Sequence, residues 1–302
     1  MNLAPIVLFV FNRLSHTQQT INALKKNTLS NLSDLIIYSD APKTQEQTQS
    51  VQQVRDYIKQ VNGFKTVTIV EREINFGLAK SIIEGVTEVC EKYGRIIVLE
   101  DDLETSPYFL QYMNDALDIY KDINDVMHVS GYMFPISGVQ ALPETFFMRT
   151  TTCWGWATWN RAWKSFKKDL SITSEFTNTM INKFNLEGSY DYWAHVRLNE
   201  KGILNTWAIF WYASVFQKNG LCLHPAISMV SNIGNDNTGS HCMETSQYDV
   251  VTASKPIIFF EADVKENSIA VAGLRQFYIS LKLPLSTRVM RKIRIIIKEC
   301  FK

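Results

Sequence analysis

The chain has 302 residues, of which 46% are hydrophobic and 20% are charged, with 31 Lys and Arg against 30 Asp and Glu. The formal net charge of +1 argues against an electrostatic surface for nucleic acid. The composition is that of a globular protein long enough to bury a large core, which excludes a disordered, collagen-like or low-complexity chain. The five cysteines contain no C-x-x-C pair, which argues against a disulfide framework or a structural zinc site.

Targeting signals are not evident. The opening MNLAPIVLFVFNR has no basic residue before its short apolar run, and no later segment reaches the length of a membrane span. We expect a cytoplasmic protein, either soluble or peripheral on the inner face of the plasma membrane. All seven tryptophans lie between positions 154 and 211, so we also expect the two halves of the chain to have different tasks.

Apolar runs and amphipathic segments alternate over the first hundred residues. The expected strands are 5–11, 35–38, 66–70 and 95–99, and the expected helices are 15–26, 46–61 and 78–93. A capping box at Ser15 and Gln18 is expected to open the first helix. This alternation predicts βαβ units in a doubly wound sheet, which binds ligands at the carboxyl ends of its strands.

Polar residues follow these strands, and the last set is Glu100-Asp101-Asp102. Three consecutive acids at the end of a buried strand repel one another and need a cation or strong donors. Mg²⁺ and Mn²⁺ prefer carboxylate oxygens and keep phosphate and water ligands, so we expect a divalent metal with a nucleotide diphosphate. The alternative is that Asp102 and Glu104 begin a helix at Pro107, where acids favour the positive end of the helix dipole.

Several other phosphate-binding proteins are excluded by missing motifs. The chain has no G-x-x-x-x-G-K-[ST] and no G-x-G-x-x-G, so it is not a P-loop NTPase and lacks the usual dinucleotide fingerprint. The first strand ends at Asn12-Arg13, where a receiver or phosphatase domain would carry an acid. A nucleotide-diphosphate site without a glycine-rich loop remains.

The segment Val98-Leu-Glu-Asp-Asp-Leu103, followed by Ser106-Pro-Tyr-Phe109, resembles the metal-binding segment of GT-A glycosyltransferases. The variant is that of N-acetylglucosaminyltransferase I and of bacterial family-2-like sugar transferases. Asn75-Phe-Gly-Leu-Ala79 resembles the N-x-G-x-A turn of family 2. Three later segments resemble motifs of the bacterial group, so that the likeness runs from about residue 5 to 242: Cys153–Trp159, Trp207–Phe216 and Val230–His241.

The resemblance implies an α/β fold of the GT-A (Rossmann-like) type, a mixed, mostly parallel sheet flanked by helices. Residues 1–255 would form one catalytic domain, with a nucleotide and metal half over 1–105 and an acceptor half over 106–255. Residues 256–302 would be a C-terminal helical extension.

The resemblance also implies roles for single residues. Asp40 would accept the uracil N–H, and Asp102 would ligate the Mn²⁺ or Mg²⁺ that bridges the phosphates, with His241 completing the metal or diphosphate site. Asp40 as a surface-turn residue and Arg13 as a salt-bridge partner stay open as alternatives. The remaining nucleotide-sugar residues would be Arg13, Asn75, Lys80, Glu100 and Asp101.

A saccharide acceptor is held by aromatic faces and hydrogen bonds. Trp154 and Trp156 stand in a dense aromatic loop and are the candidate acceptor contacts. The tryptophans spaced i and i+4 are expected to be buried helix residues, the second pair packing its helix onto the sheet: Trp159 with Trp163, and Trp207 with Trp211.

An inverting transfer needs a carboxylate that deprotonates the acceptor hydroxyl. In N-acetylglucosaminyltransferase I the base lies in a W-D-D-W pattern, and the nearest match here, Trp207-Ala208-Ile209, has no acid. Asp191 is the preferred candidate because flanking aromatics would desolvate it and make it more basic. Asp236 is the second candidate, and a helix start at Asp191 is the alternative.

Residues 284–302 intersperse basic and apolar side chains and predict an amphipathic helix, which would lie on an anionic membrane surface or pack on the domain. Together with these features, the resemblance implies a metal-dependent, inverting hexosyl- or N-acetylhexosaminyltransferase. It would move sugar from a UDP-GlcNAc-like donor to a saccharide acceptor, free or lipid-linked, in cell-surface polysaccharide synthesis. The alternative is a catalytically silent nucleotide-sugar or glycan-binding protein at the membrane, because Ala208 stands where a base is expected.

Overall fold

The computed structural model describes residues 3–169, 171–236 and 245–282. Within them the main sheet has eight strands in the order β3-β2-β1-β4-β8-β6-β9-β7, and a small sheet pairs β5 with β10. The strands of the main sheet are β1 (Ile6–Val10), β2 (Asp34–Ser39), β3 (Thr66–Glu71), β4 (Arg95–Glu100), β6 (Val126–Ser130), β7 (Thr145–Met148), β8 (Trp156–Trp159) and β9 (Leu221–Pro225). The small sheet consists of β5 (Leu103–Thr105) and β10 (Val230–Asn232).

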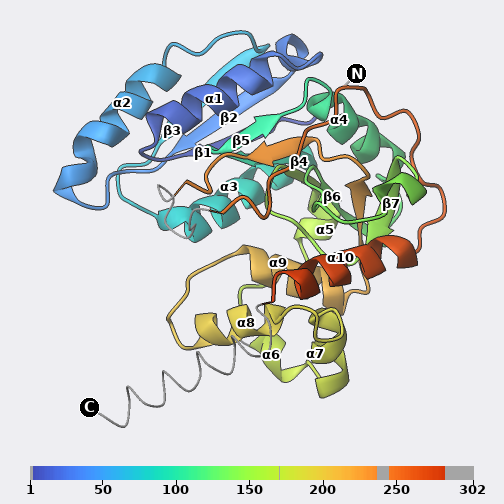
Figure 1. The fold of residues 1–302 in the computed structure, drawn as a ribbon. Coiled ribbons are helices and arrows are strands. Elements are labelled where there is room, and N and C mark those ends of the chain that lie inside the picture. The colour runs from blue at the N-terminus through green and yellow to red at the C-terminus, as the bar shows by residue number, and fades with distance from the viewer. Residues whose placement is uncertain (1–2, 170, 237–244, 283–302) are drawn as a thin grey trace.

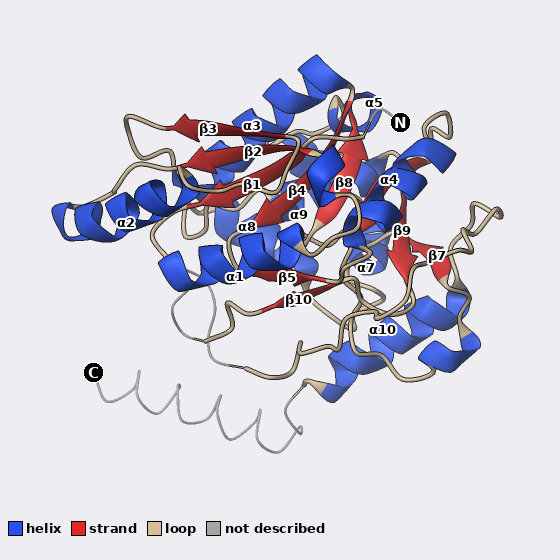
Figure 2. Cartoon of the chain, turned by 90° about the horizontal axis from the view of Figure 1, so that it is seen from above, coloured by secondary structure: helices blue, strands red, loops and turns tan. Residues whose placement is uncertain are grey.

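Strands β3, β2, β1 and β4 are parallel neighbours, and Figure 2 shows them side by side. Strand β8 runs antiparallel to both β4 and β6, while β6 pairs with β9 in parallel and β7 pairs with β9 antiparallel. The sheet is therefore mixed and mostly parallel, which confirms the predicted fold class.

Helices cover both faces of this sheet (Figure 1). Apolar side chains of α1, α2 and α4 pack on one face, and those of α3, α5 and α9 pack on the other. Helices α6, α7 and α8 form a separate layer with α9, and α10 packs on β7. The helices are α1 (Leu14–Lys25), α2 (Thr48–Ile58), α3 (Gly77–Tyr93), α4 (Phe109–Ile119), α5 (Asn160–Trp163), α6 (Ser171–Ser174), α7 (Asn178–Phe184), α8 (Tyr192–Glu200), α9 (Ala208–Gln217) and α10 (Ser268–Ser280).

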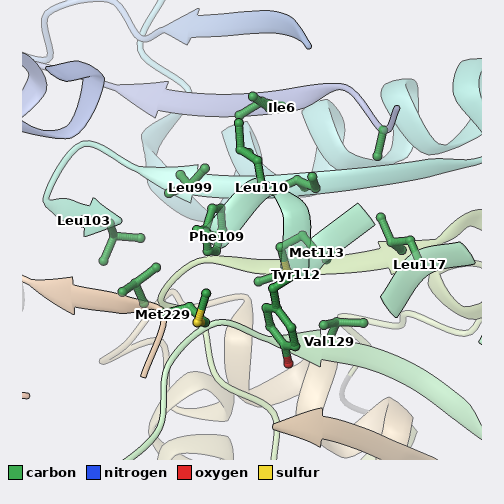
Figure 3. Packing of buried hydrophobic residues seen from close by; sticks show 14 of the residues in the cluster. Ile6, Leu99, Leu103, Phe109, Leu110, Tyr112, Met113, Leu117, Val129 and Met229 are labelled. Carbon is green, nitrogen blue, oxygen red and sulfur yellow. The ribbon is translucent and has the colours of Figure 1, made fainter. Parts of the chain in front are cut away.

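The continuous apolar runs are buried because both faces of the sheet are covered. All five residues of β1 are buried, and successive side chains enter opposite layers of the core. On one side, Ile6 and Leu99 of the main sheet pack with Phe109 of α4 (Figure 3). Leu103 of β5 and Met229, which directly precedes β10, belong to the same cluster. The small sheet thus shares one apolar cluster with the main sheet and α4, and α1 lies against β5.

The strands and helices predicted over the first hundred residues are all present, but two local expectations are wrong. Helix α1 begins at Leu14 with Arg13 as its N-cap, and no side chain caps it, so the capping box at Ser15 does not form. The residues after Asp102 form strand β5 rather than a helix start, because they pair with β10. The acids therefore end a strand, as the metal hypothesis requires.

Four of the tryptophans share one layer of the core: Trp156, Trp163, Trp207 and Trp211. Trp156 is fully buried and its ring lies against Trp163, Trp207 and Trp211. Packing of α9 on the sheet through its two tryptophans is confirmed. The helix expected to join Trp159 and Trp163 is wrong, because Trp159 ends strand β8, although both side chains are buried.

The expected C-terminal extension begins in extended form. The Tyr120 hydroxyl donates to the carbonyl of Glu261 at 2.6 Å, and the amide of Asn267 donates to the carbonyl of Phe147 at 2.8 Å. Helix α10 follows, whereas the amphipathic helix predicted at 284–302 lies outside the described residues. Among the helices that the structure describes, none has the length and apolarity needed to cross a bilayer.

Candidate active site

Two neighbouring strands bring opposite charges together at their carboxyl ends. Arg13 follows β1, and Asp101 and Asp102 follow β4, which pairs with β1. The Arg13 Nη2 donates to Asp101 Oδ1 at 2.5 Å and to Asp102 Oδ2 at 2.8 Å. The salt-bridge alternative for Arg13 is therefore observed, and its partners are the predicted metal residues themselves.

Glu100, Asp101 and Asp102, called the acid turn below, crowd one another. Burial, and then the charges of Asp102 and Asp101, raise the pKa of Glu100 to about 8. Burial also raises the pKa of Asp101, although the Arg13 charge acts in the opposite direction. Burial opposes the charge of Arg13, but its two carboxylate partners raise its pKa above the ordinary value. The turn thus carries more negative charge than Arg13 balances, which favours a further cation.

A threonine of α1 fixes the acid turn. The fully buried Thr20 hydroxyl donates to the carbonyl of Asp101 at 2.8 Å and accepts from the amide of Leu103 at 3.1 Å. Sequence reasoning missed this residue. The signal was a threonine on the buried face of an amphipathic helix, where an apolar side chain is the ordinary choice.

The chain after β10 closes one side of the turn. The amide of Ile233 donates to the carbonyl of Asp102 at 2.9 Å, and a Cβ on Gly234 would lie only 2.2 Å from Asp102 Oδ2. Next to them, Asp236 Oδ2 lies 3.1 Å from His16 Nε2 of α1, with the Asp236 side chain 43% exposed. The structure therefore brings Asp236 to the acid turn, through a histidine that sequence reasoning did not select. His241 lies outside the described residues.

Asp40, after β2, holds the start of α3. Its Oδ1 accepts from the amides of Ala41 and Phe76 at 2.9 Å, and its Oδ2 accepts from the amide of Gly77 at 2.8 Å. The Asn75 Nδ2 donates to the carbonyl of Ala41 at 2.6 Å. An anion is favourable at a helix start, and Asp40 is buried, so the surface-turn alternative is wrong.

Two cations lie beside this helix start. The guanidinium carbon of Arg72 lies 5.1 Å from the Tyr38 ring centroid and 4.6 Å from that of Phe76. The Lys80 Nζ lies 4.1 Å from the Phe76 centroid. The buried Nε of Arg72 has no hydrogen-bond partner among the described residues. Sequence reasoning noted the position of Arg72 after the third strand but did not select it.

The loop that carries Trp154 lies alongside the acid turn. Val98 is opposite Trp156 in the antiparallel pair of β4 and β8, so Trp154 approaches the level of Glu100. The Trp154 ring, partly exposed, meets Tyr132 and Tyr248 edge-on with centroids 4.6 and 5.9 Å apart. The acceptor role expected for Trp156 is wrong, because its side chain is fully buried in the core.

Asp191 is the N-cap of α8. Its Oδ1 accepts from the amide of Ala194 at 3.0 Å, and its Oδ2 accepts from Arg197 at 2.9 Å. The side chain is 55% exposed, so the expected desolvation is wrong and the helix-start alternative is confirmed.

The carboxylate ligands at the acid turn suit a metal ion that takes its other ligands from phosphate and water. Among residues 3–169, 171–236 and 245–282, no group of three or more His, Cys, Asp or Glu side chains is arranged to hold an ion. Asp101 and Asp102 supply carboxylate oxygens, and the close approach of Gly234 leaves the Asp102 carboxylate beside bare backbone. Mg²⁺ and Mn²⁺ bind one or two carboxylates and complete their shell with phosphate and water, so these residues fit.

The mixed, mostly parallel sheet flanked by helices is of the kind expected for the GT-A fold. The chain belongs to the glycosyl transferase family 2, whose sequence profile matches residues 6–184. No curated protein matches the chain.

Solved structures with similar folds share little sequence with the chain. GalNAc-T7 with UDP, GalNAc and Mn²⁺ is 12% identical, with a TM-score of 0.45, over 76% of this chain and 44% of that one. The mannosyltransferase PcManGT from Pyrobaculum calidifontis, with GDP-Man and Mn²⁺, is 11% identical, with a TM-score of 0.37, over 72% and 76%. S. aureus TarS 1-349 with UDP is 14% identical, with a TM-score of 0.32, over 44% and 37%. The chain thus spans less than half of the GalNAc-T7 structure.

Proposed function

We propose that this glycosyltransferase moves a sugar, with inversion, from a UDP-sugar of the UDP-GlcNAc kind to a saccharide acceptor, using Mn²⁺ or Mg²⁺. The observation that carries the proposal is the convergence of Arg13, Asp101 and Asp102 at the carboxyl ends of β1 and β4. Asp40 and the start of α3 lie at the end of β2, the next strand of the sheet. This is the edge where a doubly wound sheet binds its ligands.

The donor is assigned along this edge. Asp40 Oδ1 already accepts two N–H groups, whereas Oδ2 accepts one and keeps a lone pair for the uracil N–H. Arg72, with its unpartnered Nε, would bind the base edge, and Asn75 and Lys80 belong to the same helix start. The residues toward the ribose, diphosphate and sugar would be Arg13, Glu100 and Asp101.

Asp102 would hold the metal ion, together with His241. When bound, the ion stabilises negative charge on the departing nucleoside diphosphate. Arg13, which lies against Asp102, would share that task.

The base is assigned to Asp236 rather than to Asp191. Asp236 follows the residues that pack on Asp102, and its carboxylate pairs with His16 of α1. Asp191 is engaged in capping α8 and in an ion pair with Arg197. A carboxylate can take the acceptor proton during transfer only if it lies beside the donor sugar.

The acceptor would lie on the Trp154 side of the acid turn. The exposed part of Trp154, with Tyr248 edge-on to it, offers an apolar face for the C–H surface of a sugar ring. We place the reaction in cell-surface polysaccharide synthesis, where acceptors are commonly carried on lipids.

Membrane contact is assigned to the basic and apolar sequence of residues 284–302. Flotation of the full chain with anionic liposomes would test it, alongside a charge-reversed triple variant, Arg291→Glu, Lys292→Glu and Arg294→Glu. We expect the parent to float and the variant to remain below. Equal flotation would contradict peripheral binding through this segment at the inner face of the plasma membrane.

The function is tested with a panel of nucleotide sugars in the presence of Mn²⁺, read as thermal stabilisation and as slow donor hydrolysis. Uridine donors are expected to stabilise the parent protein and to be hydrolysed. Asp102→Asn should lose both responses, whereas Asp118→Asn, on the exposed face of α4, should keep them. No response of the parent to any uridine donor would refute the donor class. Glycan binding that survives Asp102→Asn, without hydrolysis in the parent, would support the binding-protein alternative.

A further inference from the structure

Arg13 is a cation that already lies at the two carboxylates expected to hold the divalent ion. Its Nη2 donates to one oxygen of Asp101 and one of Asp102, and the three side chains are 17%, 8% and 11% exposed. The guanidinium is therefore a counter-charge for both carboxylates.

The Nη1 of the same guanidinium is buried and has no hydrogen-bond partner among the described residues. A buried donor without an acceptor is unfavourable, because it has lost water and gained nothing in exchange. An anion placed next to it would satisfy the donor, and phosphate oxygens suit the planar guanidinium fork. Arg13 therefore has one nitrogen engaged with the acids and one available for a ligand.

These two observations set the order in which ligands bind. A divalent ion at Asp101 and Asp102 would share with Arg13 two carboxylates that the guanidinium already engages through one oxygen each, and two cations at one pair of carboxylates repel each other. A nucleotide diphosphate removes this conflict, since it adds negative charge and offers acceptors to Arg13.

We propose that Arg13 competes with the divalent ion for Asp101 and Asp102, so that the ion binds together with a nucleotide diphosphate and not ahead of it. The inference rests on the proposed function for its second ligand, but the competition itself concerns the ion alone. Because linkage is reciprocal, the diphosphate must raise the affinity for the ion by the same factor as the ion raises the affinity for the diphosphate.

The test is Mn²⁺ binding to the full-length protein, measured from free Mn²⁺ by electron paramagnetic resonance, with and without UDP. For the parent we expect Mn²⁺ alone to bind at least about 10-fold more weakly than Mn²⁺ with UDP. Arg13→Gln removes the competing charge and should bind Mn²⁺ alone about 10-fold more tightly than the parent, with a smaller gain from UDP. Unchanged or weaker Mn²⁺ binding by Arg13→Gln would overturn the proposal.

Two further variants secure the interpretation. Arg13→Lys keeps the charge but cannot bridge both carboxylates. Its affinity for Mn²⁺ alone should lie between those of the parent and Arg13→Gln. This variant tests the proposal even if Arg13→Gln does not fold. Arg95→Gln removes a positive charge that pairs with Asp118 instead and should leave Mn²⁺ binding unchanged. Tighter binding in Arg95→Gln would show a general charge effect and contradict competition. Failure of the parent to bind UDP with Mn²⁺ would refute the proposed function, while the comparison with Mn²⁺ alone still decides the role of Arg13.

Discussion

Gly234 lies so close to Asp102 that a Cβ on it would stand 2.2 Å from the carboxylate Oδ2. Residues that are distant in sequence thus share one site, because β10 pairs with β5 directly after the acids. The contact leaves room for hydrogen only, so this position depends on glycine for space and not for a left-handed backbone.

Gly234→Ala should therefore displace the Asp102 carboxylate. We expect the affinity for UDP with Mn²⁺ to fall by about 10-fold or more, because ligand groups that are misplaced by fractions of an ångström lose their alignment. Isothermal titration of UDP in the presence of Mn²⁺ measures the change. Ser231→Ala, on the adjacent strand, is the matched control and should bind like the parent; equal affinity in Gly234→Ala would show that Asp102 is not a ligand.

The two candidate bases are separated by their asparagine variants. Asp236→Asn should lower kcat by about 10²-fold or more with little change in donor KM, because the amide cannot accept the acceptor proton. Asp191→Asn keeps an equally good N-cap and should change kcat by less than about 2-fold. Steady-state kinetics with a transferable donor measures both, and the reverse pattern would move the base to Asp191.

Asp40 is expected to stabilise the fold as well as to bind the donor. Asp40→Ala leaves the amides of Ala41, Phe76 and Gly77 without their acceptor. The free energy of unfolding should fall by about 2–4 kcal/mol in urea denaturation. The control is the partly exposed Asp34, which pairs with Lys65 and accepts from the Thr66 hydroxyl, and Asp34→Ala should cost about 1 kcal/mol or less. A stable Asp40→Ala protein would contradict the capping role.

Trp154 and Trp156 should respond in opposite ways. Trp156→Ala empties a core position and should cost about 3–5 kcal/mol of unfolding free energy. Trp154→Ala should cost less stability and raise the KM for the acceptor about 5- to 10-fold, the loss of one aromatic contact. Chemical denaturation and acceptor kinetics distinguish them; an unchanged acceptor KM in Trp154→Ala would place the acceptor elsewhere.

His224 makes stability depend on pH. Burial lowers its pKa to about 4, and its Nε2 lies 2.9 Å from the carbonyl of Thr150. The unfolded chain takes up this proton near pH 6.5 and the folded protein only near pH 4, so acid favours unfolding within that window. The contribution at pH 7 is about 3 kcal/mol and is lost as pH falls toward 4.

Urea unfolding between pH 7 and 4.5 checks this behaviour against His224→Phe, which has no proton to take up. The variant should be less stable at pH 7, because the carbonyl of Thr150 loses its donor, but its stability should fall less steeply below pH 6.5. Parallel curves for parent and variant would show that His224 titrates normally.

Local patterns were sufficient for the strands and helices of residues 1–105. Strand β1 and helix α3 follow from a continuous apolar run and from a 3.6-residue apolar period, which depend on neighbours in the chain. The acids at 100–102 were also recognisable from the sequence, since charge at the end of a buried strand is unusual in any fold. The sequence by itself thus determined the α/β class, the strand ends and the Glu100-Asp101-Asp102 turn.

Contacts between distant segments were decided by the tertiary structure. Pairing of β1 with β4 brings Arg13 to the acids, and pairing of β5 with β10 brings Asp236 to them while Asp191 remains a helix cap. Trp154 and Trp156 are two residues apart with similar surroundings in sequence, yet only the second enters strand β8 and the core. Strand order and long-range packing depend on the combined burial of the whole chain, which no local pattern encodes, and these contacts select the residues available to a ligand.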